Sequence, residues 1–444
     1  MELSELESHK YVTVGGNQVF RNGDNGPVSL SQIPSGALIE IDADIKLSGT
    51  WILPDNCVLR YSGGTITTTR IVGKNTIIDA PPVALFNVSK VEGTWRVERG
   101  FPEWFCDTPG KWSDAIEKTL ALSPVELCFT KGVYDITRPI TSSFSNIYIA
   151  HGSTLRASGS LARPIEYMIC GDFDGRHTVP DLEVMPRIYG GGCIDGNGRA
   201  KTGVTFYRSR LSLLEGLTIQ NTIEYGFKAS RNETEAGNCI VRDCLFQNWL
   251  KDPVSKKKVV AILNNRTDCV YEDIEIVDYQ IAVRHDGLNG KYTNVHAWLL
   301  DPTLWNSSVV FDCLQPDLTL LGCEADTMCS LLRFDRPYFF ASIVNCRAYV
   351  NESVVDLNAV DSRGKPRYMM PLVIDKTIAN ASKDNIRGAR GRLSQIMLYG
   401  GVFWYNLRGN MLKYRIMDET SPHDQVEMRR YQRGLTREGA VYGN

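Results

Sequence analysis

The sequence predicts an all-β fold, a parallel β-helix built from short stacked strands, on three observations. First, one pattern recurs: a Gly, Asp or Asn, then an apolar residue, a variable residue and a second apolar residue. Second, the pattern returns at intervals in the middle twenties of residues. Third, β-branched and aromatic residues with Asn and Gly breaks dominate the repeat, whereas a helical solenoid would need long apolar stripes of 3.6-residue period.

Six copies of the pattern lie between residues 215 and 350. Their first apolar residues are Leu217, Cys244, Ile274, Val295, Cys323 and Cys346. The intervals between them are 27, 30, 21, 28 and 23 residues. Because one coil cannot bury its own apolar side, we expect the coils to stack about 4.8 Å apart and to bury alternate side chains in a shared interior.

The chain divides into four regions by pattern. We expect an N-terminal arm at 1–25, a β-rich section at 26–99, the parallel β-helix at 100–355, and a β-rich or extended C-terminal assembly region at 356–444. The β-rich section fits either the first coils or a separate small domain. The best helix pattern lies at 111–122, with an apolar side formed by Ala115, Ile116, Leu120 and Leu122. Such a helix would cap the open end of the solenoid.

Composition narrows the range of partners. The 444 residues carry a formal net charge of −2, so no overall field favours nucleic acid. The N-terminus, MELSELESHK, lacks the apolar segment of a signal peptide. No run of apolar residues approaches the length of about 18 that a membrane helix needs, so we expect no membrane insertion. The twelve cysteines include no Cys-x-x-Cys pair, so we expect buried, reduced thiols, with neither a metal nor a cofactor.

The variable residue of each copy is predicted to point outward, because its two apolar neighbours point inward and strand side chains alternate. Along the six copies these residues are Thr218, Leu245, Glu275, His296, Glu324 and Arg347. The residue before the first apolar position is predicted to share that face: Gly216, Asp243, Asp273, Asn294, Gly322 and Asn345.

This face provides candidate site residues. The catalytic candidates are Glu275, Glu324, Asp273 and His296; the substrate-binding candidates are Arg347, Asn294, Asn345 and Trp298. Glu275 and Glu324 would lie two coils apart, roughly 9–10 Å, which approaches the carboxyl separation of about 6.5–9.5 Å in inverting glycosidases. Two other interpretations stay open: Glu324 and Arg347 as an ordinary cross-strand ion pair, and contact with a glycan without chemistry.

Several segments resemble a known family. They are GFPEWF (100–105), WSDAI (112–116), ELCFTKGVYDITRPI (126–140), SNIYIAHGSTLRAS (145–158) and GGCIDGNG (191–198). Together they resemble the pectate-lyase-like, right-handed parallel β-helix superfamily, and the chain looks most like the tailspike and tail-fibre proteins of Bacteroidetes phages. Residues 30–105 look most like the β-helix proteins of gut Bacteroidetes and their phages. The polygalacturonase motifs of that superfamily are missing, and Asp195 in IDGNG is expected to shape a turn rather than to act in catalysis.

The resemblance implies a phage tailspike-like virion protein, a homotrimer that binds a bacterial surface polysaccharide, with or without depolymerising it. It would be assembled in the host cytoplasm and lie in the virion tail with other tail proteins. One alternative is a bacterial polysaccharide lyase or glycoside hydrolase, secreted or at the cell surface. Another is a structural tail component without enzymatic activity.

Overall fold

The computed structural model describes most of the chain up to residue 357 and several short strands beyond it. The described ranges are 10–14, 18–21, 27–106, 110–142, 145–172, 186–207, 211–229, 238–251, 259–315, 317–334 and 341–357, followed by short strands between 372 and 418. Most of the arm predicted at 1–25 and of the C-terminal region predicted at 356–444 lies outside these residues.

The chain forms two compact units, which are described separately. Unit 1 comprises residues 1–158 and 186–192, and unit 2 comprises residues 159–185 and 193–444. The strands of unit 1 are β1 (Lys10–Val14), β2 (Gln18–Arg21), β3 (Pro27–Val28), β4 (Leu38–Ile41), β5 (Ile45–Lys46), β6 (Thr50–Ile52), β7 (Val58–Tyr61), β8 (Ile66–Asp79), β9 (Phe86–Arg96), β10 (Arg99–Gly100), β11 (Glu126–Phe129), β12 (Gly132–Ile136), β13 (Ile140–Ser142), β14 (Asn146–Ile149), β15 (Ser153–Ala157) and β17 (Arg187–Gly190).

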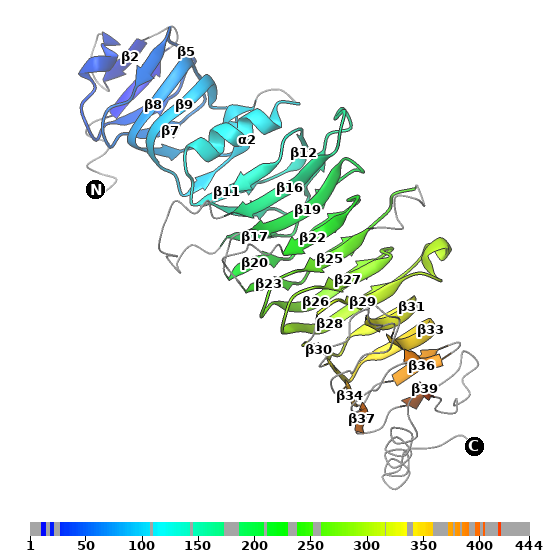
Figure 1. Ribbon diagram of the computed structural model, residues 1–444. Coiled ribbons are helices and arrows are strands. Elements are labelled where there is room, and N and C mark those ends of the chain that lie inside the picture. The colour runs from blue at the N-terminus through cyan, green and yellow to red at the C-terminus, as the bar shows by residue number, and fades with distance from the viewer. Residues whose placement is uncertain are drawn as a thin grey trace, which may run out of the picture. The chain divides into compact units, whose positions relative to one another are not determined.

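The first part of unit 1 is a mainly parallel sheet (Figure 1). β1 pairs antiparallel with β2, and β2 with β3, whereas β4, β7, β8 and β9 pair in parallel. Leu38 is paired with Val58, and Ile66 with Phe86, so the chain returns to the neighbouring strand after 20 residues in both cases. The β-rich section predicted at 26–99 therefore also stacks its strands at a regular interval.

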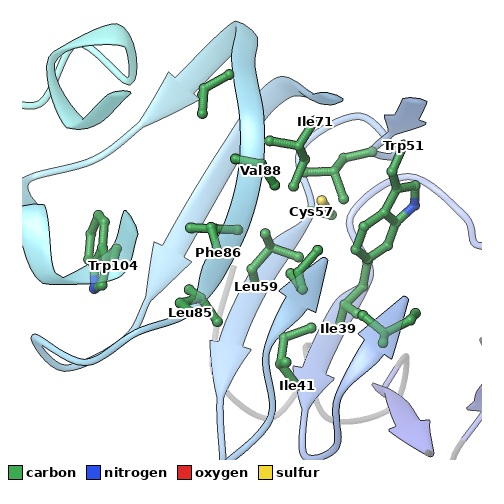
Figure 2. Packing of buried hydrophobic residues seen from close by; sticks show 14 of the residues in the cluster. Ile39, Ile41, Trp51, Cys57, Leu59, Ile71, Leu85, Phe86, Val88 and Trp104 are labelled. Atoms are coloured by element: carbon green, nitrogen blue, oxygen red, sulfur yellow. The ribbon is translucent and has the colours of Figure 1, made fainter. Parts of the chain in front are cut away.

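One apolar cluster holds this part of unit 1 together. Ile39, Leu59 and Trp51 contribute from β4, β7 and β6, and the cluster extends to Trp104 and Leu122 beyond the sheet. Figure 2 shows the labelled side chains pointing toward one another between the strands. Since Trp104 belongs to the short helix η2 (Pro102–Phe105), the β-rich section and the segment that follows share one core.

The predicted helix is present as α2 (Trp112–Ala121), the one α-helix among the described residues. Its buried residues include Ala115 and Ile116, and Leu122 follows at its C-terminal cap, as the apolar pattern predicted. Leu120 is only half-buried. The helix contacts β9, β12 and β13 of unit 1, so it covers strands with its apolar side.

Unit 2 consists of short strands that pair in parallel with strands one coil further along the chain (Figure 1). They are β16 (Ile165–Asp172), β18 (Cys193–Asp195), β19 (Ala200–Tyr207), β20 (Ser212–Glu215), β21 (Thr218–Gln220), β22 (Tyr225–Ala229), β23 (Cys239–Arg242), β24 (Leu245–Gln247), β25 (Val260–Asn264), β26 (Val270–Val277), β27 (Ile281–His285), β28 (Gly290–Trp298), β29 (Val309–Cys313), β30 (Leu318–Leu321), β31 (Glu324–Phe334), β32 (Ala341–Val344), β33 (Arg347–Leu357), β34 (Leu372–Asp375), β35 (Ile378–Ala381), β36 (Asp384–Ala389), β37 (Ile396–Tyr399), β38 (Phe403–Trp404) and β39 (Ile416–Asp418). Unit 2 also contains the short helix η3 (Pro302–Leu304).

The pairing of neighbouring strands agrees with the predicted column of inward residues. Ile274 lies opposite Val295 on neighbouring strands, and both are buried. Cys323 and Cys346 each precede a register pair, Glu324 with Arg347, and both cysteines are buried as well. The column of inward residues found by sequence alignment is thus one column in the structure.

In each of the six copies of the repeat, a corner precedes the first apolar residue, and this corner uses one residue with positive φ. These residues are Gly216, Asp243, Asp273, Asn294, Gly322 and Asn345, with φ between 52° and 72°. Asn, Asp and Gly adopt this left-handed conformation more readily than other residues, which explains why the repeat begins with them. The corners also bond to one another: Asn294 Nδ2 donates to Asp273 Oδ1 at 2.9 Å.

The described residues thus form an all-β protein with a large, predominantly parallel sheet. Its stacked strands, regular return and buried alternate side chains are compatible with the predicted parallel β-helix. The twelve cysteines are free thiols, nine of them buried and three half-buried, in agreement with their predicted role as small apolar residues.

Candidate functional site on an outer sheet face of unit 2

One sheet face of unit 2 is formed by β21, β24, the second halves of β26 and β28, and the first residues of β31 and β33. Its inward column is apolar and buried: Ile219, Phe246, Ile276, Ala297, Ala325 and Ala348. Because side chains alternate along a strand, the residues on either side of each of these point outward. The outward residues form two columns.

The first outward column is the one that the sequence predicted. Thr218 pairs with Leu245, Leu245 with Glu275, Glu275 with His296, His296 with Glu324, and Glu324 with Arg347. His296 therefore lies between two carboxylates, one on each neighbouring strand. By the usual strand spacing, Glu275 and Glu324 have Cα atoms about 9–10 Å apart.

The second outward column lies two residues further along each strand. It contains Gln220, Gln247, Val277, Trp298, Asp326 and Tyr349. Only Trp298 of this column was among the predicted site residues. Asp326 and Tyr349 were missed, although continuing the same alternation by two residues would have found both. Tyr349 is 41% exposed, which makes its ring accessible.

We name the following residues of both columns the candidate face: Glu275, His296, Trp298, Glu324, Asp326, Arg347 and Tyr349. One hydrogen bond within it links the two columns: Trp298 Nε1 donates to Glu275 Oε1 at 2.9 Å. This bond fixes an otherwise exposed carboxylate next to an aromatic ring. Val277, the register partner of Trp298, is 3% exposed although it lies on this outer face.

His296 has an unusual environment for a surface residue. The residue as a whole is half-buried, but its Nε2 atom is shielded from solvent and has no hydrogen-bond partner among the described residues. An imidazole nitrogen can accept or donate a proton near neutral pH. In strand register His296 lies between Glu275 and Glu324.

The candidate face carries more negative than positive charge. Glu275, Glu324 and Asp326 contribute three carboxylates, and Arg347 one guanidinium. Glu324 and Arg347 are register partners on neighbouring strands. The structure therefore places opposite charges opposite each other, as the cross-strand interpretation of the sequence expects.

The corner residues require one correction. Asp273, Asn294 and Asn345 were predicted to lie on the same sheet face as Glu275. All three are exposed, but each has a positive φ and forms a corner. The chain changes direction there, so β26 pairs with β23 before Asp273 and with β24 after it. These three residues therefore border the candidate face, and strict alternation fails at this position.

Asp195 shapes a turn, as predicted. Its Oδ1 accepts hydrogen bonds from Asn197 N at 2.8 Å and from Asn221 Nδ2 at 3.0 Å. Both bonds hold local main chain and a neighbouring corner in place. Asp195 has the geometry of a structural carboxylate.

Three other kinds of feature were considered among the described residues: a metal site, a membrane-spanning helix and a pocket. No group of three or more His, Cys, Asp and Glu side chains in the described ranges is arranged to hold a metal ion. Within the same part of the chain, no helix is long and apolar enough to cross a membrane. A pocket of about 80 Å³ in unit 2 is lined by Asn265, Arg266, Thr267, Asp286, Gly287, Leu288 and Gln315, none of which belongs to the candidate face.

The fold and this face together define a class: an all-β protein with stacked parallel strands, compatible with a parallel β-helix, whose outer sheet displays carboxylates, a histidine, an arginine and aromatic rings. No protein-family model, no curated protein and no solved structure matches the chain.

Proposed function

We propose that the chain is a right-handed parallel β-helix of the pectate-lyase-like kind, acting as a tailspike-like virion protein that binds a bacterial surface polysaccharide through the candidate face. The observation that carries this proposal is the shared register of Glu275, His296, Glu324 and Arg347, with Trp298, Asp326 and Tyr349 two residues further along their strands.

The arrangement suits a long polar polymer. The strands repeat about every 4.8 Å, so equivalent outward positions form a linear series of contacts along which a chain of sugar rings can lie. Carboxylates and a guanidinium offer hydrogen bonds to hydroxyl groups. Trp298 and the exposed ring of Tyr349 offer apolar surface with a polar edge, which fits the faces of pyranose rings.

Binding is tested directly with purified polysaccharides. The full-length protein would be titrated against a panel of capsular and O-antigen polymers and neutral homopolymers, with binding measured by isothermal calorimetry. The matched pair of variants is Trp298→Ala on the candidate face and Trp249→Ala, which removes an exposed indole from a loop. We expect one class of polymer to bind, Trp298→Ala to weaken it and Trp249→Ala to leave it unchanged. Equal effects of both variants would contradict the proposal.

Cleavage is decided by the products of a prolonged incubation. Glu275 and Glu324, with His296 between them, provide the groups that a glycosidase or a lyase would need. Mass spectrometry of released oligosaccharides separates the outcomes. Products with added water indicate a hydrolase, products with an unsaturated uronic acid indicate a lyase, and the absence of products leaves adhesion as the function.

Assembly and location form the second part of the proposal. The sequence resemblance to tailspike and tail-fibre proteins supports a homotrimer attached to other tail proteins of a virion. The alternative, a bacterial lyase or hydrolase, would act as a monomer. The mass of the full chain in solution distinguishes a trimer from a monomer. A virion component that fails to bind any polysaccharide in the panel would be a purely structural tail protein.

A further inference from the structure

Two cysteines lie side by side in the interior of unit 2. Cys239 begins β23, and Cys269 immediately precedes β26. The register of these strands pairs Ile240 with Val270, so the cysteines occupy neighbouring positions one residue earlier. Their Sγ atoms are 3.2 Å apart, and both residues are fully buried.

The pairing of β23 with β26 brings the two cysteines within the Cα separation of a disulfide bond. A disulfide needs Cα atoms about 4.4–6.8 Å apart and sulfur atoms about 2.0 Å apart. Neighbouring strands bring register-matched Cα atoms to about 4.8 Å. Closing the bond therefore requires only a small approach of the two sulfurs, without a change in strand register.

We propose that Cys239 and Cys269 form a disulfide that joins two successive strands of unit 2 when the protein meets a small-molecule disulfide such as glutathione disulfide. This modification site lies in the interior, and it is independent of the polysaccharide contacts of the candidate face. The bond would close the segment 239–269 into a covalent loop.

The surroundings distinguish the two thiols chemically. The Cys239 thiol donates its hydrogen bond to Cys269 Sγ, and this donation lowers the pKa of Cys269 although burial opposes it. The same bond and burial raise the pKa of Cys239. Arg266, which is 2% exposed, adds a positive charge that favours the thiolate at Cys269. While the two thiols remain in contact, the thiolate is therefore favoured at Cys269 rather than at Cys239.

The reaction has two exchange steps. The Cys269 thiolate attacks one sulfur of glutathione disulfide, the bond between the two glutathione sulfurs breaks, and one glutathione thiolate leaves. Cys239 then transfers its proton to solvent and attacks the Cys269 sulfur, so the second glutathione thiolate leaves. The two protein thiols lose two electrons and two protons, and the reagent becomes two molecules of glutathione.

Burial controls the rate of this reaction. Both sulfurs are buried, so the first attack occurs when the chain opens locally and exposes Cys269 to the reagent. Low concentrations of urea, below those that unfold the chain, are therefore expected to accelerate oxidation. The product should resist reduction by glutathione once the strands close again.

The experiment uses the full chain, purified reduced and incubated with glutathione disulfide in buffer with and without low urea. Remaining thiols are alkylated, and tryptic peptides are mapped by mass spectrometry. The expected result is a linked peptide pair containing Cys239 and Cys269, and a higher midpoint of chemical unfolding for the oxidised protein. Cys239→Ser should abolish both changes. The matched control Cys244→Ser, a buried thiol that donates to Arg242 O at 3.1 Å, should leave both intact.

Three outcomes overturn the proposal. They are full alkylation of Cys239 and Cys269 after oxidation, a lasting glutathione adduct on either residue, and a disulfide mapped only to another pair such as Cys323 and Cys346. Peptide mapping of the unsubstituted chain identifies the bond by itself, so the result stands even if Cys239→Ser fails to fold.

Discussion

The indole of Trp298 donates a hydrogen bond of 2.9 Å to the carboxylate of Glu275 on the preceding strand of the face. The two residues are not register partners, because Trp298 lies opposite Val277 and Glu275 opposite His296. The bond therefore runs diagonally across the two outward columns. It holds the Glu275 carboxylate in one orientation beside the indole ring. Without this bond, Glu275 would be an unrestrained surface side chain.

Removing this indole is expected to weaken polysaccharide binding in two stages. Trp298→Phe keeps an aromatic surface but loses the hydrogen bond to Glu275. We expect the free energy of polysaccharide binding to weaken by about 0.7 kcal/mol, a roughly threefold increase in Kd. Trp298→Ala also removes the ring. For this variant we expect the free energy of binding to weaken by about 1.5 kcal/mol, a roughly tenfold increase in Kd. Calorimetric titration measures both values. An equal loss for the two variants would show that the ring surface does not contribute.

The charge of the candidate face is expected to select against acidic polymers. Glu324→Gln combined with Asp326→Asn removes two of its three carboxylates and leaves Arg347 in place. We expect this double variant to bind a uronic-acid polymer more tightly than the unsubstituted protein at low salt. The difference should shrink at 0.5 M salt or above, roughly, where surface charges are screened. If the double variant shows no gain at low salt, the face does not select by charge.

The inward column is expected to determine stability. Ile276 is 1% exposed and lies next to Ala297 in register. Ile276→Ala should lower the free energy of unfolding by about 2–4 kcal/mol, because it leaves a cavity in a packed interior. The control Lys291→Ala changes an exposed residue of β28. Its free energy of unfolding should stay within about 0.5 kcal/mol of that of the unsubstituted protein. Urea unfolding followed by circular dichroism compares the two variants.

A corner glycine offers a test of backbone geometry. Gly322 has a φ of 64°, and a Cβ atom placed on it would lie 2.6 Å from Asn294 Oδ1. Gly322→Ala should therefore cost about 1–2 kcal/mol of unfolding free energy. The control Asn345→Gly, at an equivalent corner with a φ of 52°, removes a side chain from the same conformation and should cost far less. Similar losses for both variants would contradict the assignment of corners.

Unit 1 contains a carboxylate whose titration should affect its stability. Burial raises the pKa of Glu126, but donation from Tyr189, Cys128 and Arg99 outweighs burial and holds the pKa below its usual range. Burial, together with the hydrogen bond to Glu126, raises the pKa of Tyr189 to about 12. Since the folded state favours the Glu126 carboxylate, its contribution is present above about pH 4.3 and is lost as the pH falls further.

Tyr189→Phe removes one donor to Glu126 and should raise the pKa of that carboxyl group. We expect acid unfolding to begin at higher pH, with a loss of roughly 1 kcal/mol near neutrality. Tyr148→Phe is the matched control, because the Tyr148 ring lies 5.3 Å from the Tyr189 ring, whereas the hydroxyl that donates to Glu126 is that of Tyr189. Tryptophan fluorescence as a function of pH compares the variants. Identical acid transitions would show that the Tyr189 hydroxyl does not stabilise the carboxylate.

The register of the candidate face could be predicted because it depends on a local rule. Alternation on either side of Ile274 and Val295 is enough to place Glu275 beside His296, and the structure has them paired. Asp273 could not be placed correctly in this way. Its positive φ ends one strand segment and begins another, and no period-2 pattern reveals where alternation stops.

Two further features lay beyond the sequence pattern. Asp326 and Tyr349 follow the same alternation but were not considered, because the pattern used for the prediction ended at the second apolar residue. The diagonal bond from Trp298 to Glu275 depends on side-chain direction, which sequence spacing does not determine. The proximity of Cys239 and Cys269 follows from the pairing of β23 with β26 across a 30-residue interval, within a repeat of irregular length.

The order of strand pairing in unit 2 has a mechanical consequence. From β21 to β33, each strand is hydrogen-bonded to the strand one coil before it and the strand one coil after it. A force applied to the last coil would therefore load a few hydrogen bonds at a time and peel the coils off in succession. A force spread across all coils at once would load the hydrogen bonds of every strand pair together. The force needed to unfold unit 2 should therefore depend strongly on the direction of pull.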